Sequence, residues 1–253
     1  MKLIVNADDF GFSPGQNYGI IDAFENGIVR STSLLAVGGA VEQAVELARA
    51  HPKLGIGVHL SLDLGRPVLA PELIPSLIGP EGVFRRPSFD SSLELNIMEL
   101  EQEWRAQIEF VLAQGLKPTH LDGHHHFHLH PQLFALSCKL ARTYELALRP
   151  LPLGWPSQDY AELTTVRHPD TCVTDFYDDG VEESFFTEFF TKYPYLRDEI
   201  VEVMCHPAYV DDVIATRSSY NFPRVKELQI LKSPRVREWV EIENVQLVNY
   251  GIL

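Results

Sequence analysis

Strand-like and helix-like segments alternate along this chain, and the alternation limits its folds more than any other feature. Apolar runs typical of buried strands are separated by segments that repeat apolar residues at helical spacing. The first five segments, starting with a strand, are residues 3–7, 14–26, 33–37, 40–50 and 54–60. Parallel strands joined through helices require right-handed crossovers. We therefore expect an α/β fold built on a parallel sheet.

The alternation continues through the rest of the chain. Helices are predicted over residues 93–114 and 131–144 and near 182–191 and 225–231, and strands over residues 117–122, 146–149, 172–175, 200–205 and 245–248. This number of β/α units predicts a deformed (β/α) barrel rather than an open sheet, and 253 residues is an ordinary length for one. We expect a single domain over residues 1–253.

Two irregular stretches interrupt the pattern. The first, at about residues 63–92, holds five prolines and three glycines, which break any helical or strand period. The second covers residues 150–169. Long irregular loops inside compact domains are usually functional, so we expect an inserted loop at 63–92 that forms a substrate-binding wall or lid.

The composition excludes several classes of function. A formal net charge of −14 repels nucleic-acid backbones and anionic membranes, so neither is an expected partner. No run approaches the roughly 18 consecutive apolar residues of a spanning helix, and Lys2 is followed by only three apolar residues before Asn6, too few for a signal peptide. We expect a cytoplasmic protein with reduced cysteines that binds a neutral small molecule or a sugar, and a homodimer is the default assembly.

The first strand ends abruptly in two carboxylates, Asp8 and Asp9. Two like charges this close cannot both be buried without partners. A cation resolves the conflict if one carboxylate binds it and the other stays beside it as a base. The alternative is that both acids lie in a solvated turn or cap the next helix.

A dense run of histidines follows the predicted strand 117–122. Its members are His124, His125, His126, His128 and His130. Histidine is the commonest metal ligand, but one ion cannot use all five, and we expect most of them to be loop residues or to orient the true ligand.

His59, which ends the strand 54–60, is by itself more typical of a core histidine. With Asp9 and the histidine run it completes an Asp, His, His set. Such a set leaves coordination positions open for water and substrate, as catalytic metal sites do. It accepts magnesium, zinc, manganese or cobalt, so the residues alone do not identify the metal.

Two further polar residues follow predicted strands. The unperturbed pKa of histidine, near 6.5, makes His206 a candidate general acid, unless it is a buried histidine before a proline turn. Arg149 either pairs with a carboxylate and keeps Asp8 ionised, or is an ordinary surface arginine before Pro150.

Four motifs, in order along the chain, resemble the YdjC-like carbohydrate deacetylases, and chitooligosaccharide deacetylases most of all. They are Asn6-Ala7-Asp8-Asp9-Phe10-Gly11, Gln16-Asn17-Tyr18-Gly19-Ile20-Ile21, Pro118-Thr119-His120-Leu121-Asp122 with His124-His125-His126, and Glu202-Val203-Met204-Cys205-His206-Pro207-Ala208. The likeness extends to Tyr220-Asn221-Phe222-Pro223-Arg224 but is weaker over residues 63–92.

This resemblance implies a deformed barrel related to polysaccharide deacetylases. It implies one divalent metal ion, with Mg²⁺ favoured and Zn²⁺ an alternative, and removal of acetyl groups from N-acetylglucosamine units of an oligosaccharide. By motif, Asp9, His59 and His124 are the implied metal ligands, Asp8 the base and His206 the acid. The chemistry agrees, because amide hydrolysis needs an activated water, a stabilised oxyanion and a proton for the leaving amine. Phe84, Trp155 and Tyr220 are candidates to stack on sugar rings.

Two rival functions remain at this stage. Another metal hydrolase on the same scaffold, such as a phosphodiesterase, is disfavoured because phosphoryl chemistry usually uses paired metals and cationic clamps. A non-catalytic histidine-rich metal-binding protein explains the histidine run, but not Asp8, Arg149 and His206 at separate strand ends.

Overall fold

The computed structural model describes residues 1–89, 92–155 and 160–253. In it the described residues form one eight-stranded sheet in which every pairing is parallel, with the strand order β5-β4-β3-β2-β1-β7-β6 and β8 beside β1. The strands are β1 (Lys2–Phe10), β2 (Ser31–Leu34), β3 (Gly55–Leu60), β4 (His120–Gly123), β5 (Ala147–Leu148), β6 (Thr171–Val173), β7 (Ile200–Cys205) and β8 (Gln246–Val248). Every carboxyl end therefore points to the same edge of the sheet, as parallel pairing requires.

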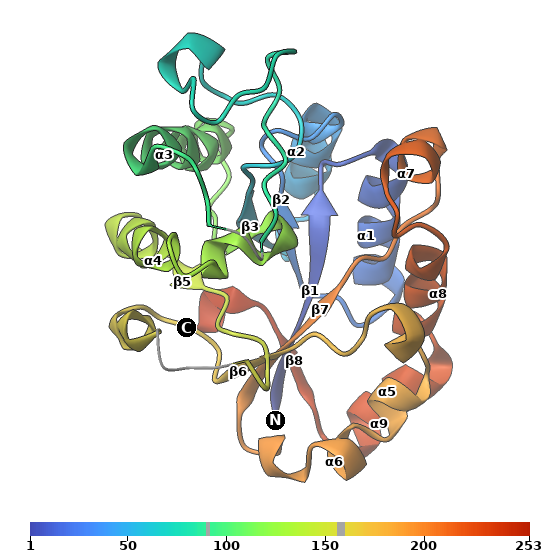
Figure 1. The fold of residues 1–253 in the computed structure, drawn as a ribbon. Helices are drawn as coiled ribbons and strands as arrows, with labels where there is room; N and C mark the ends of the chain where they lie inside the picture. The colour runs from blue at the N-terminus through green and yellow to red at the C-terminus, as the bar shows by residue number, and fades with distance from the viewer. Residues whose placement is uncertain (90–91, 156–159) are drawn as a thin grey trace.

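The helices surround the sheet on its outside (Figure 1). They are α1 (Pro14–Asn26), α2 (Val41–Ala50), α3 (Ile97–Ala113), α4 (Phe134–Thr143), α5 (Ser184–Thr187), α6 (Phe189–Lys192), α7 (Asp212–Arg217), α8 (Phe222–Leu231) and α9 (Pro234–Ile242). Local signals explain the first: Ser13 caps α1 by accepting a hydrogen bond from the Gln16 backbone N–H, and Pro14 opens the helix. Among the described residues, no helix is both long and apolar enough to cross a bilayer.

The sheet curls until its two edges meet. β5 and β6 are its edge strands, and a parallel bridge joins Pro152, just after β5, to Cys172 in β6. A backbone hydrogen bond of 2.7 Å from Leu153 N–H to the Cys172 carbonyl supports the same contact. The deformed α/β barrel that the sequence predicts is confirmed, with an irregular closure between β5 and β6.

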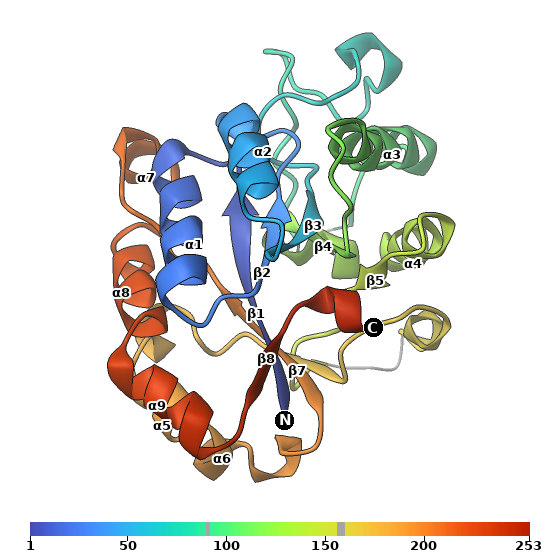
Figure 2. The ribbon, with the colours of Figure 1, turned by 180° about the vertical axis from the view of Figure 1, so that it is seen from behind.

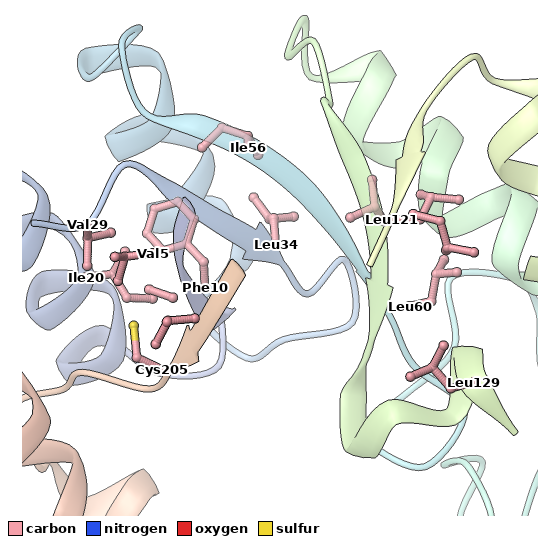
Figure 3. Close-up of a cluster of buried hydrophobic side chains, with 14 of the residues drawn as sticks. Val5, Phe10, Ile20, Val29, Leu34, Ile56, Leu60, Leu121, Leu129 and Cys205 are labelled. Atoms are coloured by element: carbon pink, nitrogen blue, oxygen red, sulfur yellow. The ribbon is translucent and has the colours of Figure 1, made fainter. Parts of the chain in front are cut away.

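The hydrophobic core lies between the sheet and the surrounding helices. Figure 3 shows Val5 and Phe10 of β1 beside Ile20 of α1, with Leu34 of β2 close by. All four side chains are completely buried. Because strands of a parallel sheet are covered by helices, they read as continuous apolar runs in the sequence.

Several predicted boundaries differ from the structure. β2 begins at Ser31 instead of residue 33, and α3 begins at Ile97, four residues after its predicted start. α7 and α9 were not predicted; α9 buries only Val236 and Trp239, so its apolar stripe is short. The described part of the 63–92 stretch is irregular apart from the short helical turn Pro71–Leu73 and an antiparallel bridge between Ile78 and Phe84. Residues 90 and 91 of that stretch, and 156–159 of the second irregular stretch, lie outside the described residues.

Candidate functional site

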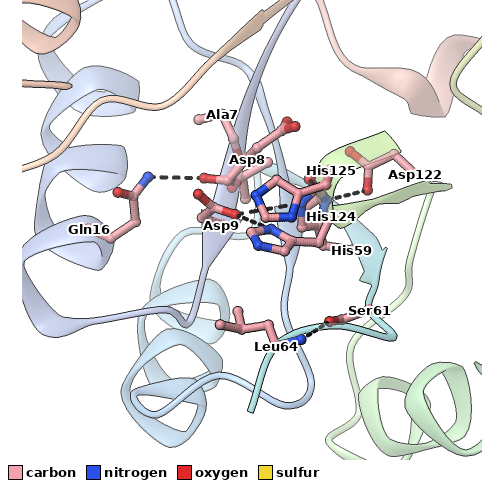
Figure 4. Close-up of polar contacts among 12 residues, drawn as sticks. Ala7, Asp8, Asp9, Gln16, His59, Ser61, Leu64, Asp122, His124 and His125 are labelled. Carbon is pink, nitrogen blue, oxygen red and sulfur yellow. Dashed lines mark hydrogen bonds and ion pairs between the residues drawn. The ribbon is translucent and has the colours of Figure 1, made fainter. Parts of the chain in front are cut away.

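The polar residues predicted at the strand ends meet at the carboxyl edge of the sheet. Asp8 and Asp9 lie near the end of β1, His59 near the end of β3, and His124 directly after β4 (Figure 4). Asp9 has a φ of +69°. This left-handed conformation is energetically unfavourable for a residue that has a side chain. The register of β1 against β2 is also irregular between Ala7 and Phe10. This break in the strand is where two consecutive carboxylates can serve one site.

Asp9, His59 and His124 form a compact donor set. Asp9 Oδ1 lies 3.1 Å from His124 Nδ1 and 3.6 Å from His59 Nε2. One ligand atom from each residue lies within 4.8 Å of the others. One carboxylate and two imidazoles suit a divalent cation, so these residues fit a single metal ion. Their assignment as ligands stays a prediction.

Two other groups of described residues meet the same spacing, Asp8 with His59 and Asp122, and Asp63 with His124 and His125. In the first, both carboxylates are already bound by an arginine. In the second, His125 is 67% exposed at its side chain and its Nδ1 lies 2.5 Å from Asp63 Oδ2. The set around Asp9 is therefore the best candidate for the metal.

Arg149 is completely buried, so the alternative of a surface arginine is wrong. Its guanidinium binds Asp8 through two hydrogen bonds, of 2.7 Å to Oδ2 and 2.6 Å to Oδ1. It also donates to Glu202 Oε1 at 2.9 Å and lies 3.0 Å from Asp122 Oδ2. Burial alone would raise the pKa of Asp8, but the Arg149 charge lowers it below the usual value. Asp8 is thus ionised, and its assignment as the base stays a prediction.

A second buried arginine holds the other carboxylate. Arg224, on α8, donates to Asp9 Oδ2 at 2.9 Å and to Gln16 Oε1 at 2.8 Å. Gln16 in turn donates to the Asp8 backbone carbonyl at 3.0 Å. Burial opposes ionisation of Asp9, but Arg224 and His124 lower its pKa well below the usual value. The two acids at the end of β1 are therefore fixed by separate arginines.

Asp122 contacts both His59 and Arg149, and so connects the candidate metal ligands with the arginine that holds Asp8. Its Oδ1 lies 2.8 Å from His59 Nδ1, which leaves His59 Nε2 directed toward Asp9. Carboxylates commonly orient metal-binding histidines in this way. Burial disfavours the charged ring, but the Asp122 carboxylate outweighs it and raises the pKa of His59 to about 9.

The other histidines of the run lie in the short helical turn His124–Leu129, which follows β4, or directly after it. His125 and His126 adopt left-handed φ angles of 49° and 58°, so the chain turns sharply after His124. Burial lowers the pKa of His126 to about 3, so its ring is neutral. His128 is completely buried. Only His124 of this run contacts Asp9 within the part of the chain that the structure describes.

His206 follows β7 and borders the same cavity as Asp8 and Asp9. Its environment differs from the one its ordinary pKa suggested, since burial and Arg224 lower its pKa to about 4. Its backbone N–H donates to Glu227, whose Oε1 lies 3.9 Å from His206 Nδ1. The Tyr220 hydroxyl also donates to Glu227, so this carboxylate is a shared support on α8.

A cavity of about 720 Å³ opens over these groups. The two irregular stretches border it through Asp63, Arg86 and Trp155. The role of residues 63–92 as a substrate-binding wall stays a prediction. Trp155 and Tyr220 line the cavity, but Phe84 is only 3% exposed and belongs to the hydrophobic core. Phe84 is therefore not available to stack on a ligand.

Sequence reasoning did not assign roles to several residues that the structure places in the site. They are Asp63, Asp122, Glu202, Arg224 and Glu227. One signal could have identified Glu202, because a carboxylate inside the apolar run 200–205 must be buried and therefore needs a partner. Arg224 and Glu227 lie on a helix near the end of the chain, and no local pattern connects them with β1.

Sequence comparisons match this chain to a protein family and to carbohydrate deacetylases. The model of the YdjC-like protein family matches residues 2–242. A carbohydrate deacetylase of Geobacillus stearothermophilus is 41% identical over 248 residues, which cover 98% of this chain and 96% of that protein. A carbohydrate deacetylase of Brevibacillus brevis is 40% identical over the whole of both chains.

Solved structures agree with these sequence matches. The crystal structure of a putative cellobiose-phosphate cleavage protein from Enterococcus faecalis is 37% identical and superposes with a TM-score of 0.92 over 99% of this chain and 98% of that one. A lactam utilization protein from Thermus thermophilus shares the fold at 18% identity, with a TM-score of 0.59 over 98% of this chain and 99% of that one. With a family model that covers nearly all of its length and relatives at about 40% identity, this chain belongs to the YdjC-like family.

Proposed function

We propose that this protein is a carbohydrate N-deacetylase that hydrolyses the N-acetyl group of N-acetylglucosamine units in short chitooligosaccharides and releases acetate. One observation supports this most: Asp8 is held by Arg149 beside the Asp9, His59 and His124 set but outside it. A purely metal-binding protein has no need for an ionised carboxylate of this kind. Hydrolysis needs one as a base.

The metal site is proposed to hold one divalent cation, with Mg²⁺ favoured and Zn²⁺ as the alternative. When bound, such a cation polarises the acetyl carbonyl and lowers the pKa of water. Asp9, His59 and His124 supply its ligands, and Asp122 keeps the His59 ring oriented. Arg149 and Arg224, the arginines that contact Asp8 and Asp9, are taken up by those carboxylates and are not free to bind a reacting phosphoryl group beside the metal, which disfavours a phosphodiesterase.

Proton transfer is assigned to residues of the chain itself. Asp8 accepts the proton of the attacking water, because Arg149 keeps it ionised and directed. His206 delivers a proton to the leaving nitrogen. The negative charge that develops on the substrate favours the protonated form of His206, which borders the cavity beside Asp8 and Asp9.

The cavity walls suit a sugar of one or two rings. Tyr177 and Tyr220 stack in parallel with ring centroids 4.1 Å apart, and both border the cavity with Trp155. Flat aromatic surfaces bind the apolar faces of sugar rings. Arg86 and Arg217 also border it, so a phosphorylated disaccharide, the compound class in the description of the E. faecalis protein, is a second candidate.

Mass spectrometry of acetylated chitobiose tests the proposal directly. Protein loaded with Mg²⁺ or Zn²⁺ should remove one acetyl group and release an equal amount of acetate, and protein treated with a chelator should not. Acetylated chitobiose that carries a phosphate, and cellobiose phosphate without an acetyl group, distinguish the substrates. If no acetylated sugar loses acetyl with either metal, the proposal is wrong, and metal binding without turnover would favour the non-catalytic alternative.

A further inference from the structure

The last strand of the described chain, β8, lies at the amino end of β1. β8 pairs only with the first residues of β1, where Gln246 lies opposite Lys2 and Val248 opposite Ile4. The helical turn η6 (Tyr250–Ile252) follows it and ends near β5, which Figure 2 shows from behind. This segment, residues 246–253, is therefore at the opposite end of the barrel from the cavity.

Tyr250 is the residue that this segment places inside the barrel. It is only 1% exposed, and its ring stacks on His120 of β4 with centroids 3.8 Å apart and planes at 10°. Its hydroxyl donates a hydrogen bond to Glu202 Oε2. A buried phenol needs a polar partner, and here the partner is a carboxylate of β7 rather than water.

Glu202 connects Tyr250 with Arg149. Its other oxygen, Oε1, accepts from Arg149 Nε at 2.9 Å and lies 2.8 Å from Nη2. The two terminal nitrogens of the same guanidinium bind Asp8. Hydrogen bonds therefore run without a break from Tyr250 through Glu202 and Arg149 to Asp8.

We propose that Tyr250 is a positioning residue for catalysis, which fixes the orientation of Asp8 through Glu202 and Arg149. The proposal rests on the proposed function, in which Asp8 is the base. The planar guanidinium of Arg149 binds Asp8 through its terminal nitrogens and Glu202 through Nε, so it cannot rotate while Glu202 is held. Without the Tyr250 hydroxyl, Glu202 Oε2 loses this donor and the carboxylate is free to reorient, which shifts Oε1 relative to Arg149. The base then loses its fixed geometry, to which reaction rates are sensitive.

Tyr250→Phe is the sharpest variant because it removes one oxygen and keeps the ring that stacks on His120. With acetylated chitobiose and the metal that supports turnover in wild type, kcat should fall about ten-fold, as is typical when an outer partner of a catalytic group is lost. KM and bound metal per chain should stay unchanged, because the metal ligands and the cavity walls are untouched. Tyr144→Phe is the matched control, since it removes a Tyr–Glu hydrogen bond of 2.8 Å to Glu109 at the surface, and its kcat should equal that of wild type.

A double-mutant cycle tests whether the effect travels through Glu202. Glu202→Gln should lower kcat to a similar extent, and the double variant should be no slower than the slower single variant, since both break one chain of contacts. If Tyr250→Phe does not fold, Glu202→Gln alone carries the test, with the same expected loss at unchanged KM and metal content.

Each result decides the matter. An unchanged kcat in Tyr250→Phe, a loss accompanied by loss of metal, or two losses that multiply in the double variant would overturn the positioning role. If wild type itself releases no acetate, the proposed function is overturned and this inference with it. Active wild type with an equally active Tyr250→Phe variant overturns the inference alone.

Discussion

Replacing Arg149 with methionine should destabilise the metal-free protein by about 4 kcal/mol. Arg149 is the common partner of Asp8, Asp122 and Glu202, and all four side chains are at most 3% exposed. Methionine keeps a similar length but leaves the carboxylates buried without their cation. Removing one partner of a buried ion pair costs about 3–5 kcal/mol.

The cost of protonating a carboxylate gives a second estimate of the stability loss, with a similar magnitude. The variant relieves the repulsion if one carboxylate takes up a proton, and protonating an acid of ordinary pKa at pH 7 costs about 4 kcal/mol. Against a total stability of about 5–15 kcal/mol this is a large fraction. For a chain of 253 residues the loss corresponds to a melting temperature about 8 °C lower.

Urea unfolding in the presence of a chelator measures this loss without interference from a bound cation. Arg105→Met is the control: Arg105 pairs with Glu101 one turn away on α3 at a partly exposed position, and such pairs contribute about 0.5 kcal/mol or less. If Arg149→Met loses no more stability than Arg105→Met, the buried network is not what holds Asp8 ionised, and the reasoning is refuted.

Three further predictions concern the site. Asp9→Ala, His59→Ala and His124→Ala should each lose bound metal and activity, because three ligands leave no redundancy. The measurement is metal content per chain. A His124 variant that keeps full metal would show that another histidine of the run is the ligand. Asp8→Asn should keep its metal but lose most turnover, since an amide cannot accept the proton; near-normal kcat would remove Asp8 from the mechanism. His206→Ala should slow deacetylation of the amide by roughly two to four orders of magnitude, but should slow an activated acetate ester far less, because that leaving group needs no proton. Equal losses on both substrates, measured on folded protein, would exclude His206 as the acid.

Local patterns in the sequence were sufficient to predict the strands, most of the helices and the edge where the site lies. α1, with its Ser13 cap, and β7 have the predicted bounds, because caps, apolar periods and strand runs depend on neighbouring residues. Parallel strands all end at one edge, so the polar residues that follow them had to meet there. For this reason Asp9, His59 and the histidine run could be grouped before any coordinates were known, and the resemblance to the family then singled out His124.

The partners of those residues were decided only by the tertiary structure. Arg224 binds Asp9 across 215 positions of sequence, and Arg149 binds Asp8 across 141. Such pairs depend on the strand order, on the curl of the sheet and on which side chains point into the barrel, none of which leaves a local trace. The same holds for Tyr250, which reads as an ordinary residue near the end of the sequence. Its role follows from β8 pairing with the start of β1, because that pairing places its hydroxyl against Glu202.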